Sequence, residues 1–199
     1  MRTRVFVLSL LVAVGLTACA PGAPQPDATP TPEPTTTINI PAITIPADCE
    51  NLVDAATYEA TFGSTPLNDP SLAENYPVGN LPPATAPDGA AIDEVVEAGT
   101  QLRCVWRDPG ADVTYLQVQI GSAGEGVGVE YLKKLQLDDY TCDETLGGTR
   151  CTLTGTDPQY QVEIGDTAFV RDDMVVRIDQ ANFPTENLLD AVVATLWHD

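Results

Sequence analysis

Residues 101–120 read QLRCVWRDPGADVTYLQVQI and contain two apolar alternations on either side of a turn. Alternation with a period of two is typical of a strand that buries one face, and Asp108-Pro109-Gly110 is typical of a tight turn. The stretch therefore predicts a β-hairpin with strands at residues 101–107 and 113–120. The side chains expected on its buried face are Leu102, Cys104, Trp106, Leu116, Val118 and Ile120.

Three more short strands are predicted further along the chain. Residues 160–164, 168–171 and 174–179 are rich in strand-forming residues and are separated by Gly165-Asp166 and Asp172-Asp173, which favour tight turns. We therefore expect a three-strand meander in addition to the hairpin.

Helical patterns flank these strands. Asp48 and Gly63 are suited to begin and end the first helix, and residues 64–88, rich in Pro, Asn and Gly, predict a long loop. Helices are expected at residues 49–62, 89–98, 129–137 and 184–197. This order predicts an α+β fold, in which helices pack on an antiparallel sheet within a single domain at residues 47–199.

The N-terminus has the features of an export signal. Arg2 and Arg4 precede about a dozen apolar residues, the length of a signal core and too short to span a bilayer. Leu16-Thr17-Ala18-Cys19 follows and resembles the bacterial lipoprotein consensus, in which the cysteine is acylated by chains such as palmitate. We expect residues 1–18 to be a lipoprotein signal peptide and Cys19 to hold the lipid anchor. The alternative is ordinary secretory cleavage after Ala20, which discards Cys19.

Residues 19–46 predict a lipid-anchored spacer rich in Pro and Thr. Positions 20–46 hold eight prolines in 27 residues. Such a segment does not form a packed core. A polyproline-like chain rises about 3.1 Å per residue, so the spacer reaches at most about 80 Å.

The cysteine count fits an oxidising compartment. Without Cys19, four of the five cysteines remain, and four allow three pairings. Cys142 and Cys151 flank a Gly-Gly turn that brings them together, so we expect them to form a disulfide. Cys49 and Cys104 then form the second disulfide by elimination.

The chain is strongly acidic. It has 29 Asp and Glu against nine Lys and Arg, and loss of Arg2 and Arg4 with the signal leaves a net charge of −22. Such a surface is repelled by phosphate backbones, so we expect no nucleic-acid partner. Solubility at the cell envelope is one explanation of this charge, and binding of a cation or a cationic peptide is another.

Several features of the chain occur together as a pattern. They are Asp48-Cys49-Glu50-Asn51-Leu52, a long loop, Cys104-Val105-Trp106, the paired Cys142 and Cys151, and a C-terminal helix. Over most of residues 47–199 the pattern resembles small actinobacterial cell-envelope lipoproteins of unknown function. Some domains of that kind are similar to the PsbP-like α+β fold, which implies an antiparallel sheet layered with helices. The resemblance implies no catalytic residue.

The residue types of common catalytic mechanisms are sparse. His198, the only histidine, is next to last in the chain, so a Ser-His-Asp arrangement has no suitable base. Ser64, Ser71 and Ser122 lie in neither Gly-x-Ser-x-Gly nor Ser-x-x-Lys. The glycine-rich residues 121–128 match neither nucleotide-binding pattern. We therefore expect no cofactor and no enzymatic activity.

The densest acidic group lies beside Cys142. Asp138, Asp139, Asp143 and Glu144 surround it, and a loop closed by a disulfide is one way to hold oxygen ligands around Ca²⁺. The spacing is not that of an EF-hand. A solvated charged turn is the alternative interpretation.

Two classes of function remain open. The first is a lipid-anchored protein on the extracytoplasmic face of the cell membrane that binds an envelope protein, a wall polymer or a small ligand without catalysis. The second is a carboxylate-dependent hydrolase that acts on cell-wall glycans. Two carboxyl groups converging in a cleft, about 5–9.5 Å apart, would favour the hydrolase.

Mass spectrometry of the mature N-terminus tests the anchor. We expect a diacylglyceryl group on Cys19, because the lipobox directly follows a short signal core. An unmodified chain that begins at Pro21 would show ordinary secretory cleavage instead.

Overall fold

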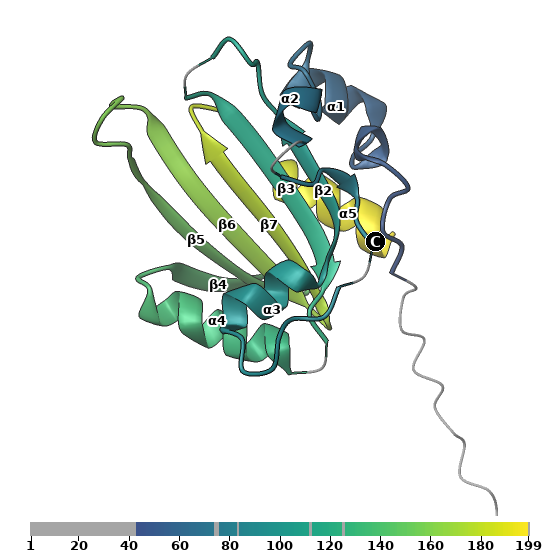
Figure 1. The fold of residues 1–199 in the computed structure, drawn as a ribbon, viewed down its shortest axis with the longest axis vertical. Helices are drawn as coiled ribbons and strands as arrows, with labels where there is room; N and C mark the ends of the chain where they lie inside the picture. The colour runs from purple at the N-terminus through teal and green to yellow at the C-terminus, as the bar shows by residue number, and fades with distance from the viewer. Residues whose placement is uncertain (1–42, 74–75, 83, 112, 125, 199) are drawn as a thin grey trace, which may run out of the picture. The chain divides into compact units, whose positions relative to one another are not determined.

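The apolar alternations form the two faces of a seven-stranded antiparallel sheet in one α+β domain (Figure 1). A computed structural model describes residues 43–73, 76–82, 84–111, 113–124 and 126–198, so the predicted signal peptide, Cys19 and most of the predicted spacer lie outside the described residues. The strands lie in the order β1-β2-β3-β7-β6-β5-β4. Their bounds are β1 Gly79–Asn80, β2 Thr100–Trp106, β3 Tyr115–Ser122, β4 Thr141–Thr145, β5 Gly148–Thr156, β6 Glu163–Arg171 and β7 Met174–Ala181.

Helices pack on both faces of this sheet. The bounds are η1 Cys49–Asn51, α1 Ala55–Phe62, α2 Pro70–Ala73, α3 Ile92–Ala98, α4 Val127–Leu137 and α5 Leu188–Trp197, η1 being a 3-10 turn. We call one side the α5 face, with the buried sheet residues Leu102, Cys104, Leu116, Val118, Ile120, Val176 and Ile178. We call the other side the α4 face, with the buried sheet residues Cys151, Ala168, Val170 and Val175.

The predicted hairpin is present as β2 and β3. Its six expected core side chains, including Trp106, are fully buried. Trp106 stacks on Phe62 of α1, with ring centroids 3.9 Å apart and planes 5° from parallel. The alternation therefore identifies both the strands and the side on which they are buried.

The C-terminal strands differ from the predicted meander. The prediction of a turn at Gly165-Asp166 is wrong, because both residues lie inside β6, opposite Gln180 and Asp179 of β7. The turn lies earlier, where the Asp157 carboxylate accepts hydrogen bonds from the backbone of Gln159 and Tyr160. A continuous ladder with β7 outweighs the local turn preference of a Gly-Asp pair.

The N-terminal helical region is also divided differently. The predicted helix between Asp48 and Gly63 is broken into η1 and α1, because the Asp54 carboxylate caps a new helix through the backbone of Ala56 and Thr57. Gly63 ends α1 as expected. The predicted loop at residues 64–88 contains α2 and the short edge strand β1.

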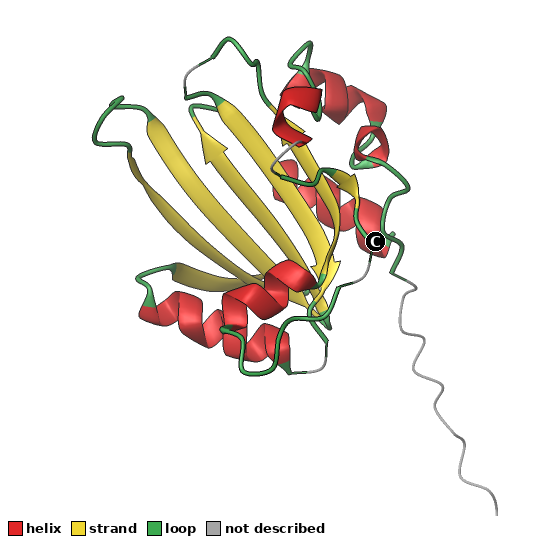
Figure 2. Cartoon of the chain, in the orientation of Figure 1, coloured by secondary structure: helices red, strands yellow, loops and turns green. Residues whose placement is uncertain are grey.

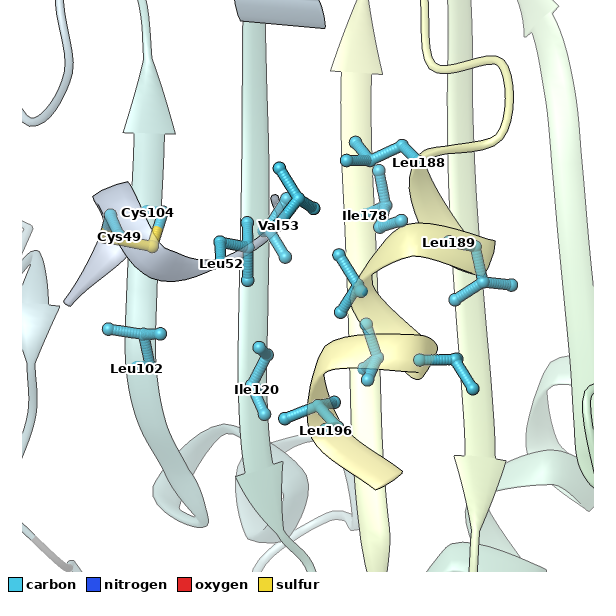
Figure 3. Close-up of a cluster of buried hydrophobic side chains, with 14 of the residues drawn as sticks. Cys49, Leu52, Val53, Leu102, Cys104, Ile120, Ile178, Leu188, Leu189 and Leu196 are labelled. Carbon is cyan, nitrogen blue, oxygen red and sulfur yellow. A yellow bond between two sulfur atoms is a disulfide. The ribbon is translucent and has the colours of Figure 1, made fainter. Parts of the chain in front are cut away.

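The core of the α5 face is shown in Figure 3, where α5 crosses β6 and β7 and η1 crosses β2. All six residues of the predicted apolar stripe of α5 are buried. Burial of one such side chain contributes about 1.5–3 kcal/mol, so this helix is a major source of stability. The six residues are Leu188, Leu189, Val192, Val193, Leu196 and Trp197.

The structure contains the two disulfides that the sequence favours. Cys49 is joined to Cys104, which connects η1 to β2. Cys142 is joined to Cys151, its directly opposed partner in the β4–β5 ladder. Hydrophobic periodicity does not predict either strand of that ladder, because most of their residues are polar and Cys151 alone among them is buried.

The end of the predicted spacer belongs structurally to the domain. Ile43 and Ile45 pack against the core of the α5 face, and the Thr44 amide donates a hydrogen bond to the Leu196 carbonyl at 3.1 Å. Across the described ranges, no helix combines the length and hydropathy that a membrane span requires.

The backbone of Gly121 in β3 lies very close to the backbone of Gly99 at the end of α3, and this contact is essential to the α4 side of the fold. Gly121 lies opposite Thr100, and a Cβ atom placed on it would lie 2.1 Å from the Gly99 carbonyl oxygen. Gly99 ends α3 immediately before β2 begins, so this contact sets how closely the helix approaches the sheet.

We expect Gly121→Ala to lower the free energy of unfolding by about 1–3 kcal/mol, because two backbones must separate to admit the methyl group. The control is Gly155→Ala, where the nearest atom would be an Ile164 side-chain carbon at 3.8 Å. Urea denaturation measures both variants. Equal stability of the two variants would contradict this account.

Candidate functional site

Helices α3 and α4 cover only one end of the α4 face, and the strands continue beyond them (Figure 2). The uncovered part contains a cleft of about 580 Å³. Small-molecule sites in proteins occupy about 300–1,000 Å³, so this size suits an organic ligand. The register places the floor of the cleft on β3, β7, β6 and β5.

Two aspartates form the polar floor of the cleft. Asp166 of β6 and Asp179 of β7 are directly opposed in the ladder, and both line the cleft. The Tyr115 hydroxyl donates to Asp179 Oδ1 at 3.0 Å, and the Tyr140 hydroxyl donates to Asp166 Oδ2 at 2.9 Å. Like charges on directly opposed residues destabilise a sheet, so this pair has an energetic cost that the two tyrosines reduce.

The environment shifts the protonation equilibria of these groups. Burial, followed by the charge of Asp166, raises the pKa of Asp179, while the hydrogen bond from Tyr115 and the charge of Arg177 lower it. Burial is also the main cause that raises the pKa values of Tyr115 and Tyr140, and the carboxylates add to it. Both phenols therefore keep their protons and remain hydrogen-bond donors to the aspartates.

A charged layer separates this floor from α3. The carboxylate of Glu97 forms an ion pair with Arg103 and accepts a hydrogen bond from Gln119 Nε2 at 2.9 Å. Arg177 Nη1 lies 3.7 Å from Glu97 Oε2, and the Arg103 guanidinium lies 4.2 Å from the centre of the Tyr76 ring. Glu97 therefore joins β2, β3 and β7 to α3 through their side chains.

The walls of the cleft are apolar and accessible. Leu153 of β5, Tyr160 of the β5–β6 turn and Ile164 of β6 are 40%, 48% and 36% exposed, respectively. All three line the cleft, together with Val162. Exposed apolar side chains gathered around a hollow are typical of a binding site rather than of a solvated surface.

The acidic group beside Cys142 does not form a single site. Asp143 makes two hydrogen bonds with Arg150, Glu144 accepts one from Thr149, and Asp138 forms an ion pair with Lys134. Asp139 has a positive φ of 66° in the turn after α4. Within the described parts of the chain, no three His, Cys, Asp or Glu side chains are placed to hold a metal ion.

The other residues considered for catalysis or nucleotide binding do not come together in one site. His198 caps the C-terminus of α5 with its backbone in the left-handed region. Lys133 is paired with Glu130, and Lys134 with Asp93 and Asp138. Residues 121–128 connect β3 to α4 as the sequence suggested, although Glu125 lies outside the described residues.

Comparison with known proteins gives no relative on which to base a function. No protein-family model matches the chain, and no curated protein is significantly similar to its sequence.

The aspartates of the floor were missed in the sequence for a specific reason. The sequence predicts a turn at Gly165-Asp166 and makes Asp179 the last residue of the strand at 174–179. The sequence feature that could reveal them is the alternation in β7. Val176 and Ile178 lie on the α5 face, whereas Arg177 and Asp179 alternate with them and lie on the opposite face. Charged residues at alternate positions of a strand indicate that helices cover that face of the sheet only in part.

We expect Asp179→Asn to raise the melting temperature at pH 7. The raised pKa means that the folded state binds the proton more tightly than the unfolded chain, so the ionised carboxylate costs stability above the unfolded-state pKa of about 3.9. Removing one charge from the opposed pair should raise the free energy of unfolding by about 0.2–1 kcal/mol. The melting temperature should then rise by up to about 4 °C.

The difference in melting temperature between Asp179→Asn and the wild type should shrink as the pH falls through the raised pKa of Asp179. The wild-type carboxyl group then becomes neutral as well. Scanning calorimetry at pH 7, 5 and 3.5 measures this trend, with Glu130→Gln on the exposed side of α4 as the control. A lower melting temperature for Asp179→Asn at pH 7 would show that its charge stabilises the fold.

Proposed function

We propose that this chain is a lipid-anchored extracytoplasmic protein whose domain binds a ligand in the cleft of the α4 face without chemical conversion. The cleft is the observation on which the proposal depends, because it combines a volume of about 580 Å³, apolar walls and a few fixed polar groups. Ligand sites in proteins are typically built in this way.

The anchor and location rest on the N-terminal sequence. The lipobox ending at Cys19 supports attachment to the outer side of the cell membrane, and the Pro-rich segment supports a spacer between lipid and domain. Two disulfides support an oxidising compartment. The proposed partners are therefore the membrane, through the lipid, and a small ligand or a segment of wall polymer or envelope protein, through the cleft.

Hydrolysis of cell-wall glycans is the second candidate function. Asp166 and Asp179 provide the specific observation in its favour, because they are opposed carboxyl groups on the floor of a cleft and one of them has a raised pKa. Glycosidases use such a pair, with the proton held by the carboxyl group of higher pKa.

Photo-crosslinking in intact cells tests the binding function. A benzophenone amino acid in place of Leu153 lies on the cleft wall, whereas the same group in place of Leu137 lies on the exposed end of α4. After irradiation, we expect mass spectrometry of the purified chain to show an adduct of defined mass at position 153 and none at position 137.

Two results would contradict the binding function. One is the absence of an adduct at position 153, or the same adducts at both positions. The other is release of reducing sugars from purified cell-wall glycans, abolished by Asp166→Asn or Asp179→Asn. That result would establish the hydrolase in its place.

A further inference from the structure

The polar part of the cleft has more negative than positive charge. The charged side chains that line it are those of Asp157, Asp166 and Asp179, against the guanidinium group of Arg107. The neighbouring charged layer adds one carboxylate, of Glu97, and two guanidinium groups, of Arg103 and Arg177. With all of these groups ionised, one negative charge remains uncompensated beside the apolar walls.

The arginines of the charged layer are already engaged away from the floor. Arg103 is paired with Glu97 and hydrogen-bonded to the Pro77 carbonyl at 2.8 Å. Arg177 interacts electrostatically with Asp179, but its guanidinium also lies 3.7 Å from the Glu97 carboxylate. Arg177 therefore balances only part of the negative charge of Asp179.

One carboxylate oxygen on the floor has no hydrogen-bond donor. Asp166 Oδ1 is buried and has no hydrogen-bond partner among the described residues, whereas Oδ2 accepts from Tyr140. A buried carboxylate oxygen without a donor costs about 1–3 kcal/mol or more. A positive charge placed in the cleft beside the Asp166 carboxylate would reduce that cost through its charge.

The apolar walls adjoin these acceptors. Leu153 is the direct ladder partner of Asp166 on β5, and Ile164 precedes it by two residues on the same face of β6. Tyr160 lines the same cleft with an exposed ring. An occupant that fits must therefore place a positive donor and an apolar group side by side.

We propose that the cleft binds an amphipathic organic cation, with a protonated amine on Asp166 and Asp179 and an apolar chain or ring against Leu153, Tyr160 and Ile164. This inference rests on the proposed binding function and specifies its ligand class. The positive charge of an ammonium group is attracted to the two carboxylates that line the cleft, and the tyrosine rings lining the cleft add favourable cation–π contact.

Calorimetry with three octyl probes tests this inference. The full chain with Cys19→Ala is titrated with octylammonium, 1-octanol and octanoate, so that no acyl chain of the protein competes for the cleft. The three probes share one apolar chain and differ in charge. We expect octylammonium to bind at least about tenfold more tightly than 1-octanol, and octanoate to bind most weakly.

Charge-neutralising variants locate the cation. Asp166→Asn and Asp179→Asn should each weaken octylammonium binding about tenfold and leave 1-octanol binding unchanged. Glu130→Gln, on the exposed side of α4, should change neither affinity. Circular dichroism confirms that each variant is folded, and the wild-type probe series tests the ligand class even if one variant fails to fold.

Equal affinities for octylammonium and 1-octanol would overturn the inference while leaving the cleft as an apolar binding site. Stronger binding of octanoate, or no binding of octylammonium, would also overturn it. The photo-crosslinking experiment makes no assumption about charge, so it tests the binding function independently of these outcomes.

Discussion

The pairing of β3 with β7 is the constraint on which the rest of the structure depends. It joins a hairpin near the middle of the chain to a meander at its end, and its register runs from Tyr115 opposite Ala181 to Ser122 opposite Met174. Only this long-range ladder makes the two faces continuous, so that α5 covers one face across β7 and α4 packs on the other. The cleft spans the same junction, because its floor combines Tyr115 of β3 with Asp179 of β7.

The two faces of this sheet serve different physical purposes. The α5 face is covered by apolar side chains of η1, α1 and α5, and its aromatic rings pack closely. On the α4 face, helices cover one end only, and the cleft beyond them is lined by tyrosines and carboxylates beside apolar side chains. The stability gained on the first face offsets the cost of opposed acids on the second, which is the usual relation between a rigid core and a functional surface.

Much of the fold could be predicted from local pattern, whereas the candidate site could not. The alternation in residues 101–120 and the apolar stripe of residues 188–197 identify buried faces directly. By contrast, β4 and β5 are mostly polar and bury only Cys151, so hydrophobic periodicity gives no signal for them. Asp166 and Asp179 lie opposite each other because of the register between β6 and β7. A pattern within either strand alone does not reveal that register.

The Cys49–Cys104 disulfide has a mechanical consequence. A pull on the chain N-terminal to residue 43 first loads the contact between Thr44 and Leu196, and then reaches Cys49. The covalent bond passes the load straight to β2, so the segment between the two cysteines, including α1, α2, β1 and α3, is not stretched. Tension along a tether would therefore enter the sheet at β2, directly beside the floor strand β3, without first extending α1, α2, β1 or α3.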